Sequence, residues 1–447
     1  MVDEKPVLSL GSLLLTRIFQ AFRMAIQPSK LALAFAAVTI IALTGGIMDL
    51  SRTVVTGTYL VTPAQAAASG EADNRRVTEL DIYLLPHASL ENFVASRDSH
   101  ADRTGVFATL CRFAARESYT AVLGLLSLNL PAVAGSVVHS VRALVWVLRW
   151  HPFYSILFFT VAGVVLAAAG GGICRIAALQ FSRGEKPSLQ QAARFARRKI
   201  ISLLGGLVGP VVLVFVFGLP ILLLGLVGNV PYLGELLTGL LLLPTLAVAC
   251  VATITLIGAV GGTGLICPAV AYEDSDSFDA INHSFSYLYS KPWHLGLYTV
   301  VAAVYGALCY LFVRFFAFLL LWTTYRFLAI GFVGQNVKLH ALWPEPTFTS
   351  LLGAAGAMPD AWSWTVAAVL IRLGVLVVLG LMVAFVISFY FSASTIIYTL
   401  MRYQVDQTPL AEVCVSPDET AAPASSFEVK SQATPQPATA MDGGSPS

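Results

Sequence analysis

The residues best suited to chemistry are four carboxylates, Glu273, Asp274, Asp276 and Asp279, within seven consecutive positions. Such clusters bind divalent cations when a ligand loop of the EF-hand type surrounds them, but this spacing does not follow that loop pattern. Acidic side chains also stabilise the first turn of a helix. Because a stretch with helical periodicity follows, we expect helix capping, with Asp276 as the N-cap.

Familiar catalytic patterns are missing from the sequence. It has no His-Glu-x-x-His zinc motif and no Gly-x-Ser-x-Gly nucleophile elbow. The glycines at 258–264 lack the Lys-Ser/Thr pair of a phosphate-binding loop. His283 falls on a polar helix face, and His294 lies beside Trp293 at an expected membrane interface. We therefore expect no catalytic residues, cofactor or metal, and a protein that is not an enzyme.

The composition indicates a membrane protein. Of 447 residues, 57% are hydrophobic and only 12% are charged, with a mean hydropathy of +0.76, whereas soluble domains carry about 25% charged residues. Between Ile200 and Tyr272 the only acidic or basic side chain is Glu235. Nucleic-acid binding is excluded because no basic face could neutralise phosphates. The widely spaced cysteines indicate neither a disulfide framework nor a zinc site.

Apolar stretches predict an all-α integral membrane protein with about six transmembrane helices. A helix needs about 20 apolar residues to cross roughly 30 Å of hydrocarbon. The qualifying stretches are 31–50, 153–176, 201–224, 238–265, 296–314 and 368–395.

Lysine and arginine set the expected orientation, because they concentrate in cytoplasmic loops. Four lie before Leu31 and seven lie between Arg175 and Lys199, whereas the loop at 225–237 has none. Both termini are therefore expected in the cytoplasm, with the protein multi-pass in a bacterial inner membrane.

Five regions follow from this orientation. They are a cytoplasmic amphipathic segment (1–30), the first span (31–50), an extracytoplasmic segment with amphipathic helices on the outer membrane surface (51–150), a five-helix transmembrane region (151–400) and a disordered cytoplasmic tail (401–447). Residues 63–68 resemble a signal-peptide cleavage site. However, a leader of more than 60 residues would be needed, so we favour an uncleaved first span.

An internal repeat is also predicted. Three of the spans are expected to run outward from the cytoplasm, and the other three to return. Amphipathic stretches at 13–27, 188–199 and 277–289 precede the outward spans. A lysine follows or ends each stretch: Lys30, Lys199 and Lys291. The first two returning spans end in glycine-rich runs, and the third ends in small residues. We infer three hairpins, each preceded by an interfacial helix, and expect a capping box of Ser188 and Gln191 at the second.

The three amphipathic stretches differ in charge, which suggests different partners. Basic residues expected to contact anionic membrane lipids are Lys30, Arg194, Arg197, Arg198 and Lys199. The third stretch carries Asp279 instead, so the acidic segment 273–279 is expected to offer a surface to a basic protein partner. Small-xxx-small spacing predicts close helix packing at Gly205, Gly209, Gly258 and Gly262.

The segment from Cys267-Pro268 through the acidic run to Ser284-Phe285-Ser286-Tyr287 resembles a family of uncharacterised bacterial polytopic membrane proteins. These are similar to the membrane domain fused to some glycerophosphodiester phosphodiesterases. The resemblance covers roughly residues 170–310 and rests mainly on hydropathy. It implies the polytopic architecture. The family's soluble catalytic domain has no counterpart here, so no hydrolase activity is implied.

The expected function is the organisation of lipids or partner proteins by a membrane protein without an active site. The alternative is a transporter or channel for an unidentified substrate, favoured by prolines and glycines that could break helices. It is weakened because no acidic residue falls at mid-membrane. Arg314 and Arg372 are expected at the outer interface, extending toward headgroups rather than lining a substrate path.

Overall fold

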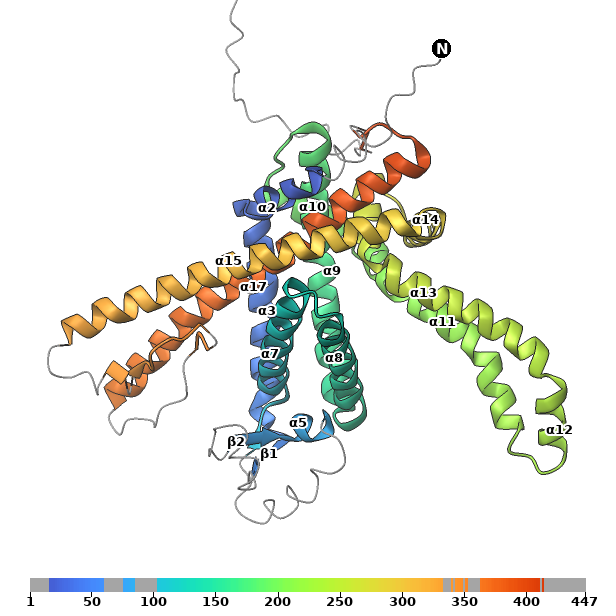
Figure 1. Ribbon diagram of the computed structural model, residues 1–447, viewed down its shortest axis with the longest axis horizontal. Coiled ribbons are helices and arrows are strands. Elements are labelled where there is room, and N and C mark those ends of the chain that lie inside the picture. Colours follow the sequence, from blue (N-terminus) through green and yellow to red (C-terminus); the bar gives the residue numbers. More distant parts are fainter. Residues whose placement is uncertain are drawn as a thin grey trace, which may run out of the picture. The chain divides into compact units, whose positions relative to one another are not determined.

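The computed structural model describes residues 16–59, 75–84, 103–332, 339–340, 342–348, 350–352, 362–410 and 412–413. Within these ranges, seven helices are long and apolar enough to cross a membrane, which confirms the all-α polytopic class (Figure 1). They are α3 (Pro28–Met48), α8 (Leu130–Trp150), α9 (Pro152–Arg183), α11 (Ile200–Val227), α13 (Leu242–Glu273), α15 (Pro292–Gly331) and α17 (Trp362–Asp406).

Six of these helices pair as the three predicted hairpins. Helix α3 packs along α9, α11 along α13, and α15 along α17. Short helices precede each outward helix: η1 (Arg17–Phe19) with α2 (Gln20–Ala25), then α10 (Leu189–Arg198), then α14 (Ser277–Ser290). Helix α12 (Leu233–Leu240) lies between α11 and α13.

Local signals explain where the second unit begins. Gly184 ends α9 with a left-handed φ of 73°, a conformation that glycine adopts without a steric penalty. The Ser188 side chain accepts a hydrogen bond from the Gln191 backbone, and Gln191 bonds back to Ser188. The predicted capping box is therefore confirmed. Helix α10 then buries Ala192, Phe195 and Ala196 against the protein.

Residues 106–150, which lie within the predicted extracytoplasmic segment, contain two helices. They form a hairpin of α7 (Val106–Leu126) and α8. Asp49, at the end of α3, accepts hydrogen bonds of 2.8 Å from the backbone of Phe107 and Ala108. At the other end, the Ser155 hydroxyl of α9 donates to the Val147 carbonyl at 2.8 Å. The hairpin therefore starts and finishes beside the same end of the α3–α9 pair, and α8 supplies the seventh apolar helix.

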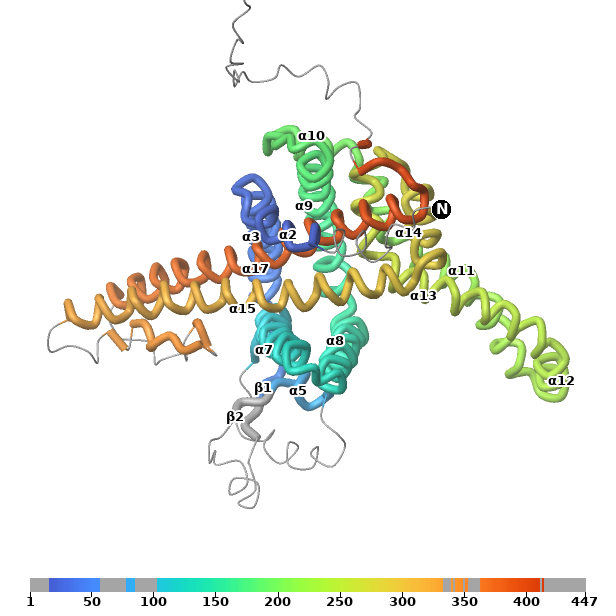
Figure 2. Tube along the Cα trace, turned by 45° about the horizontal axis from the view of Figure 1, so that its top comes forward, coloured from blue at the N-terminus to red at the C-terminus, as the bar shows by residue number. Residues whose placement is uncertain are grey.

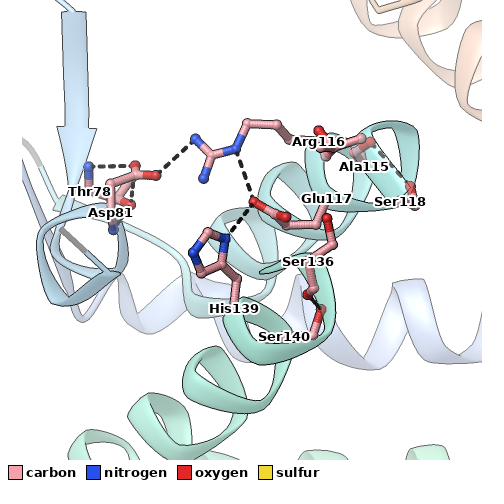
Figure 3. Close-up of polar contacts among 10 residues, drawn as sticks. Thr78, Asp81, Ala115, Arg116, Glu117, Ser118, Ser136, His139 and Ser140 are labelled. Atoms are coloured by element: carbon pink, nitrogen blue, oxygen red, sulfur yellow. Dashed lines mark hydrogen bonds and ion pairs between the residues drawn. The ribbon is translucent and has the colours of Figure 1, made fainter. Parts of the chain in front are cut away.

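A small sheet lies beside this hairpin. Strand β1 (Val54–Tyr59) pairs antiparallel with β2 (Arg75–Thr78) and β3 (Arg103–Thr104). Helix α5 (Glu79–Leu84) follows β2, and its Asp81 lies 3.2 Å from Arg116 Nη1 on α7 (Figure 3). Glu117 lies between Arg116 Nε at 3.8 Å and His139 Nδ1 at 3.6 Å. These ion pairs link α5, α7 and α8. No short sequence pattern predicts this arrangement.

The third hairpin and the tail also differ from prediction. Helix α15 has 40 residues and α17 has 45, well beyond the predicted 296–314 and 368–395. The predicted disordered tail began at residue 401, yet α17 continues to Asp406. Tyr272 Oη then donates to the Leu410 carbonyl at 3.0 Å, so packing orders this stretch. Residues 414–447 fall outside the described residues.

Candidate functional site

In each of the three units, one lysine joins the start of the outward helix to the end of the returning helix. The pairs are Lys30 Nζ with Gln180 Oε1 at 3.0 Å, Lys199 Nζ with the Asp274 carbonyl at 2.6 Å, and Lys291 Nζ with the Gln404 carbonyl at 2.7 Å. Cations are favoured near the C-terminus of a helix, where its last carbonyls lack partners. We call the end of the fold that contains these three pairs the lysine junction.

The core beside the lysine junction is made from the last turns of the three returning helices. Residues 169–179 of α9, 265–272 of α13 and 392–401 of α17 are continuously buried. Small side chains in these segments allow the helices to approach one another closely. A Cβ atom on Gly170, for example, would lie 2.4 Å from the Phe391 ring. The small-residue runs that marked the repeat therefore lie at corresponding places in the three hairpins.

Arg175 is a junction residue that the sequence analysis counted only as a loop charge. It lies inside α9 and is 1% exposed. Its Nη1 donates to the Ala271 carbonyl of α13 at 2.7 Å, and its guanidinium lies 5.0 Å from the centre of the Phe195 ring of α10. Arg175 thus connects three helices. The adjoining glycine-rich run was the only sequence signal of its burial.

A polar pocket of about 520 Å³ opens at the lysine junction. The end of α13, the start of α14 and the end of α17 supply its walls. The lining residues are Glu273, Asp274, Ser275, Asp276, Asp279, His283, Arg402, Asp406 and Thr408. Five of these nine residues are carboxylates, so the pocket is predominantly acidic. It brings the predicted acidic segment together with α17, which is more than a hundred residues away in the chain.

The deepest carboxylate of the pocket is well compensated. Glu273 Oε1 accepts a hydrogen bond from Tyr398 Oη at 2.5 Å and lies 3.5 Å from Arg402 Nε. His283 Nε2 lies 3.2 Å from Glu273 Oε2. These contacts tie α13, α14 and α17 together, so Glu273 has a clear structural role.

A second tyrosine–carboxylate pair closes the wall between α14 and α17. Tyr287 Oη donates to Asp406 Oδ2 at 2.5 Å. Burial, and then the bond to Asp406, raise the pKa of Tyr287 well above its usual range. The phenol therefore stays protonated and remains a donor at physiological pH.

The remaining acids of the segment lie nearer the surface. Asp274 Oδ1 lies 3.4 Å from Arg198 Nη2 and 3.3 Å from Lys199 Nζ. Asp276 and Asp279 are exposed, and neither forms an ion pair within the described ranges. Asp276 is the N-cap residue of α14, but its side chain makes no capping hydrogen bond. That corrects the capping role predicted for Asp276 and leaves its carboxylate facing outward.

The predicted lipid-contact residues separate into three groups. Arg194 and Arg197 are exposed on α10, as expected for groups that contact headgroups. Arg198 is also exposed, but it and Lys199 face Asp274. Lys30 is 0% exposed and bonds to Gln180, so its assignment to a lipid surface is corrected. Local sequence could not show this, because Gln180 lies 150 positions away.

The four packing glycines all face α14. Added Cβ atoms on Gly205 and Gly209 of α11 would lie 2.3 Å from Ser277 Oγ and 2.6 Å from Ile281 Cδ1. On α13, an added Cβ on Gly258 would lie 2.8 Å from the Phe285 ring, whereas one on Gly262 would be in ordinary contact with that ring at 3.4 Å. Helix α14 is therefore fixed against both helices of the second hairpin, and this positions the pocket wall.

Arg314 is buried among protein groups, whereas the prediction had its side chain extending toward lipid headgroups. It is 6% exposed, within α15. Its Nη2 donates to the Phe348 carbonyl at 3.0 Å and its Nη1 to Tyr310 Oη at 2.9 Å, while the Tyr119 ring lies 4.7 Å away. Arg372, by contrast, is exposed on α17.

Within the described residues, no group of three or more His, Cys, Asp or Glu side chains could hold a metal ion. The five carboxylates make the pocket a charged recess. Comparison of the chain with protein-family models, with curated proteins and with solved structures finds no match.

Proposed function

We propose that this polytopic membrane protein is a non-catalytic scaffold that organises membrane lipids and partner proteins around the lysine junction, on the cytoplasmic side of a bacterial inner membrane. The observation that carries the proposal is the division of charge in the pocket. Glu273 and Asp274 are compensated by neighbouring bases, whereas Asp276 and Asp279 are exposed without an ion pair in the described structure. A basic segment of a partner protein suits these two carboxylates.

The polar contacts of the pocket support binding rather than catalysis. Tyr287 is held protonated, and Glu273 is bonded to Tyr398 and lies beside Arg402. Tyr287 is therefore not poised to release a proton at neutral pH.

A direct test uses the full-length protein in nanodiscs of neutral lipid and a fluorescent oligolysine peptide. We expect salt-sensitive binding, because exposed charges interact through the solvent. Asp276→Asn combined with Asp279→Asn should weaken binding about tenfold, which corresponds to about 1.4 kcal/mol. The matched control is Glu185→Gln, which removes one exposed acid from the loop before α10. Unchanged binding in the double variant would contradict the proposal.

The transporter alternative rests on one observation. Arg314 is a buried charge inside a candidate span, and such residues often mark substrate paths. Its bonds to Phe348 and Tyr310 equally suit a structural role. Flux of radiolabelled anions into proteoliposomes, abolished by Arg314→Lys while the fold is retained, would favour transport over the scaffold.

A further inference from the structure

Several arginines of the short helices η1, α2 and α10 lie near the lysine junction. Arg194 and Arg197 are exposed on α10, and Arg23 is exposed on α2. Arg17 of η1 lies 5.7 Å from the centre of the Phe181 ring near the end of α9. Helix α10 packs on α9 (Figure 2), so η1, through Arg17, and α10 both contact the C-terminal half of α9. We call Arg17, Arg23, Arg194 and Arg197 the basic collar.

Exposed apolar side chains accompany these bases. Phe19 is 51% exposed beside Arg17, and Ile201 is 81% exposed at the start of α11, just after α10. A polar side rich in arginine next to exposed apolar groups is typical of segments that lie in the headgroup region. The long apolar helices α3 and α11 begin directly after α2 and α10. A bilayer around α3 and α11 would therefore bring its headgroups to the collar.

The apolar side of α10 is not available to lipid. Ala192, Phe195 and Ala196 are buried in the protein. These three side chains therefore pack within the protein rather than against lipid. Attraction between the collar and lipid must come mainly from charge, which makes it specific for anionic headgroups.

The third unit supplies an internal contrast. Helix α14 occupies the place of α10 in its unit, because Lys291 follows it and reaches the end of α17 just as Lys199 reaches the end of α13. Yet α14 begins with exposed Asp276 and Asp279. Anionic lipid is repelled there, so lipid contacts should differ between otherwise equivalent positions.

We infer that anionic phospholipid headgroups bind the basic collar, with Arg194 and Arg197 of α10 at its centre, and avoid the equivalent position at α14. The inference rests on the part of the proposed function that concerns lipid organisation. It does not depend on peptide binding at the pocket. Each arginine near an anionic leaflet contributes about a fivefold gain in affinity.

The experiment titrates the full-length protein in neutral detergent with short-chain phosphatidylglycerol or phosphatidylcholine, and counts bound lipids by native mass spectrometry. We expect wild type to prefer phosphatidylglycerol. Arg194→Gln combined with Arg197→Gln should lower this preference at least about fivefold. Arg194→Lys with Arg197→Lys should retain the preference for phosphatidylglycerol, because the charges are kept. This variant distinguishes the loss of charge from misfolding caused by substitution at these positions.

Arg372→Gln, which removes an exposed arginine of α17 outside the collar, is the matched control and should leave the phosphatidylglycerol preference unchanged. Equal binding of the two lipids by wild type, or an unchanged preference in the glutamine variant, would overturn the inference. Oligolysine binding measured on the same samples separates the two proposals. A glutamine variant that loses lipid preference but still binds the peptide locates lipid recognition at the collar alone.

Discussion

Lys199 Nζ lies 2.6 Å from the backbone carbonyl of Asp274, so one side chain joins the first residue before α11 to the first residue after α13. Asp274 adopts a left-handed φ of 51°, which turns the chain away from α13 toward α14. The same lysine also lies 3.3 Å from the Asp274 carboxylate. A single contact thus closes the hairpin and positions the acidic wall of the pocket.

Replacing this lysine should loosen the second hairpin. Lys199→Gln removes the charged donor and is expected to cost about 1–2 kcal/mol, because a hydrogen bond from a charged group is lost at a largely buried position. Thermal unfolding of the purified protein in detergent measures the effect. Lys186→Gln, in the exposed loop before α10, is the matched control. Equal melting temperatures for the two variants would refute the role of Lys199.

Close packing of α14 against α11 gives a second prediction. Gly209→Leu places a side chain where Ile281 Cδ1 already lies, and overpacking of this kind costs about 1–3 kcal/mol. Gly218→Leu in the same helix has no atom within 4 Å of its new Cβ and should be tolerated. Protease cleavage around residues 274–277 should increase only in the Gly209 variant. If both variants resist protease equally, α14 does not depend on this contact.

The repeat illustrates what local sequence can predict. Apolar runs, amphipathic stretches and the lysine after each stretch are local signals, and they predicted the three hairpins with their preceding helices. The capping box at Ser188 was equally local. Such features succeed because periodicity and helix-end chemistry act over a few residues.

Features that depend on distant partners were missed. The burial of Lys30 depends on Gln180, and the placement of residues 407–410 depends on contacts such as that from Tyr272 to Leu410. The α7–α8 hairpin depends on Asp49 bonding to residues 58 and 59 positions away. Of the pocket, the acidic segment was predicted, but Arg402 and Asp406 were not, because α17 is brought to α13 only by tertiary packing.

Arg314 and Arg372 should respond differently to the same substitution. Arg314 is buried and donates to the Phe348 carbonyl through two nitrogens. Lysine cannot reproduce this fork, so Arg314→Lys is expected to cost about 1–3 kcal/mol. Arg372 is exposed, and Arg372→Lys should change stability by no more than about 0.5 kcal/mol. Thermal unfolding in detergent compares the two, and identical shifts would show that the Arg314 contacts contribute nothing.

The seventh apolar helix bears directly on the membrane topology. Seven crossings would place the termini on opposite sides of the membrane. However, α7 starts beside Asp49 and α8 ends beside Ser155, so the α7–α8 hairpin returns to the side on which it begins. The number of net crossings therefore stays even. Reporter fusions at Gly184 and Ser447 should both read cytoplasmic, and one at Asn74 should read extracytoplasmic, because the basic residues before Leu31 and at 175–199 favour retention inside. Opposite readings at Gly184 and Ser447 would show that the chain makes an odd number of crossings between them, which the paired hairpins α11–α13 and α15–α17 do not allow.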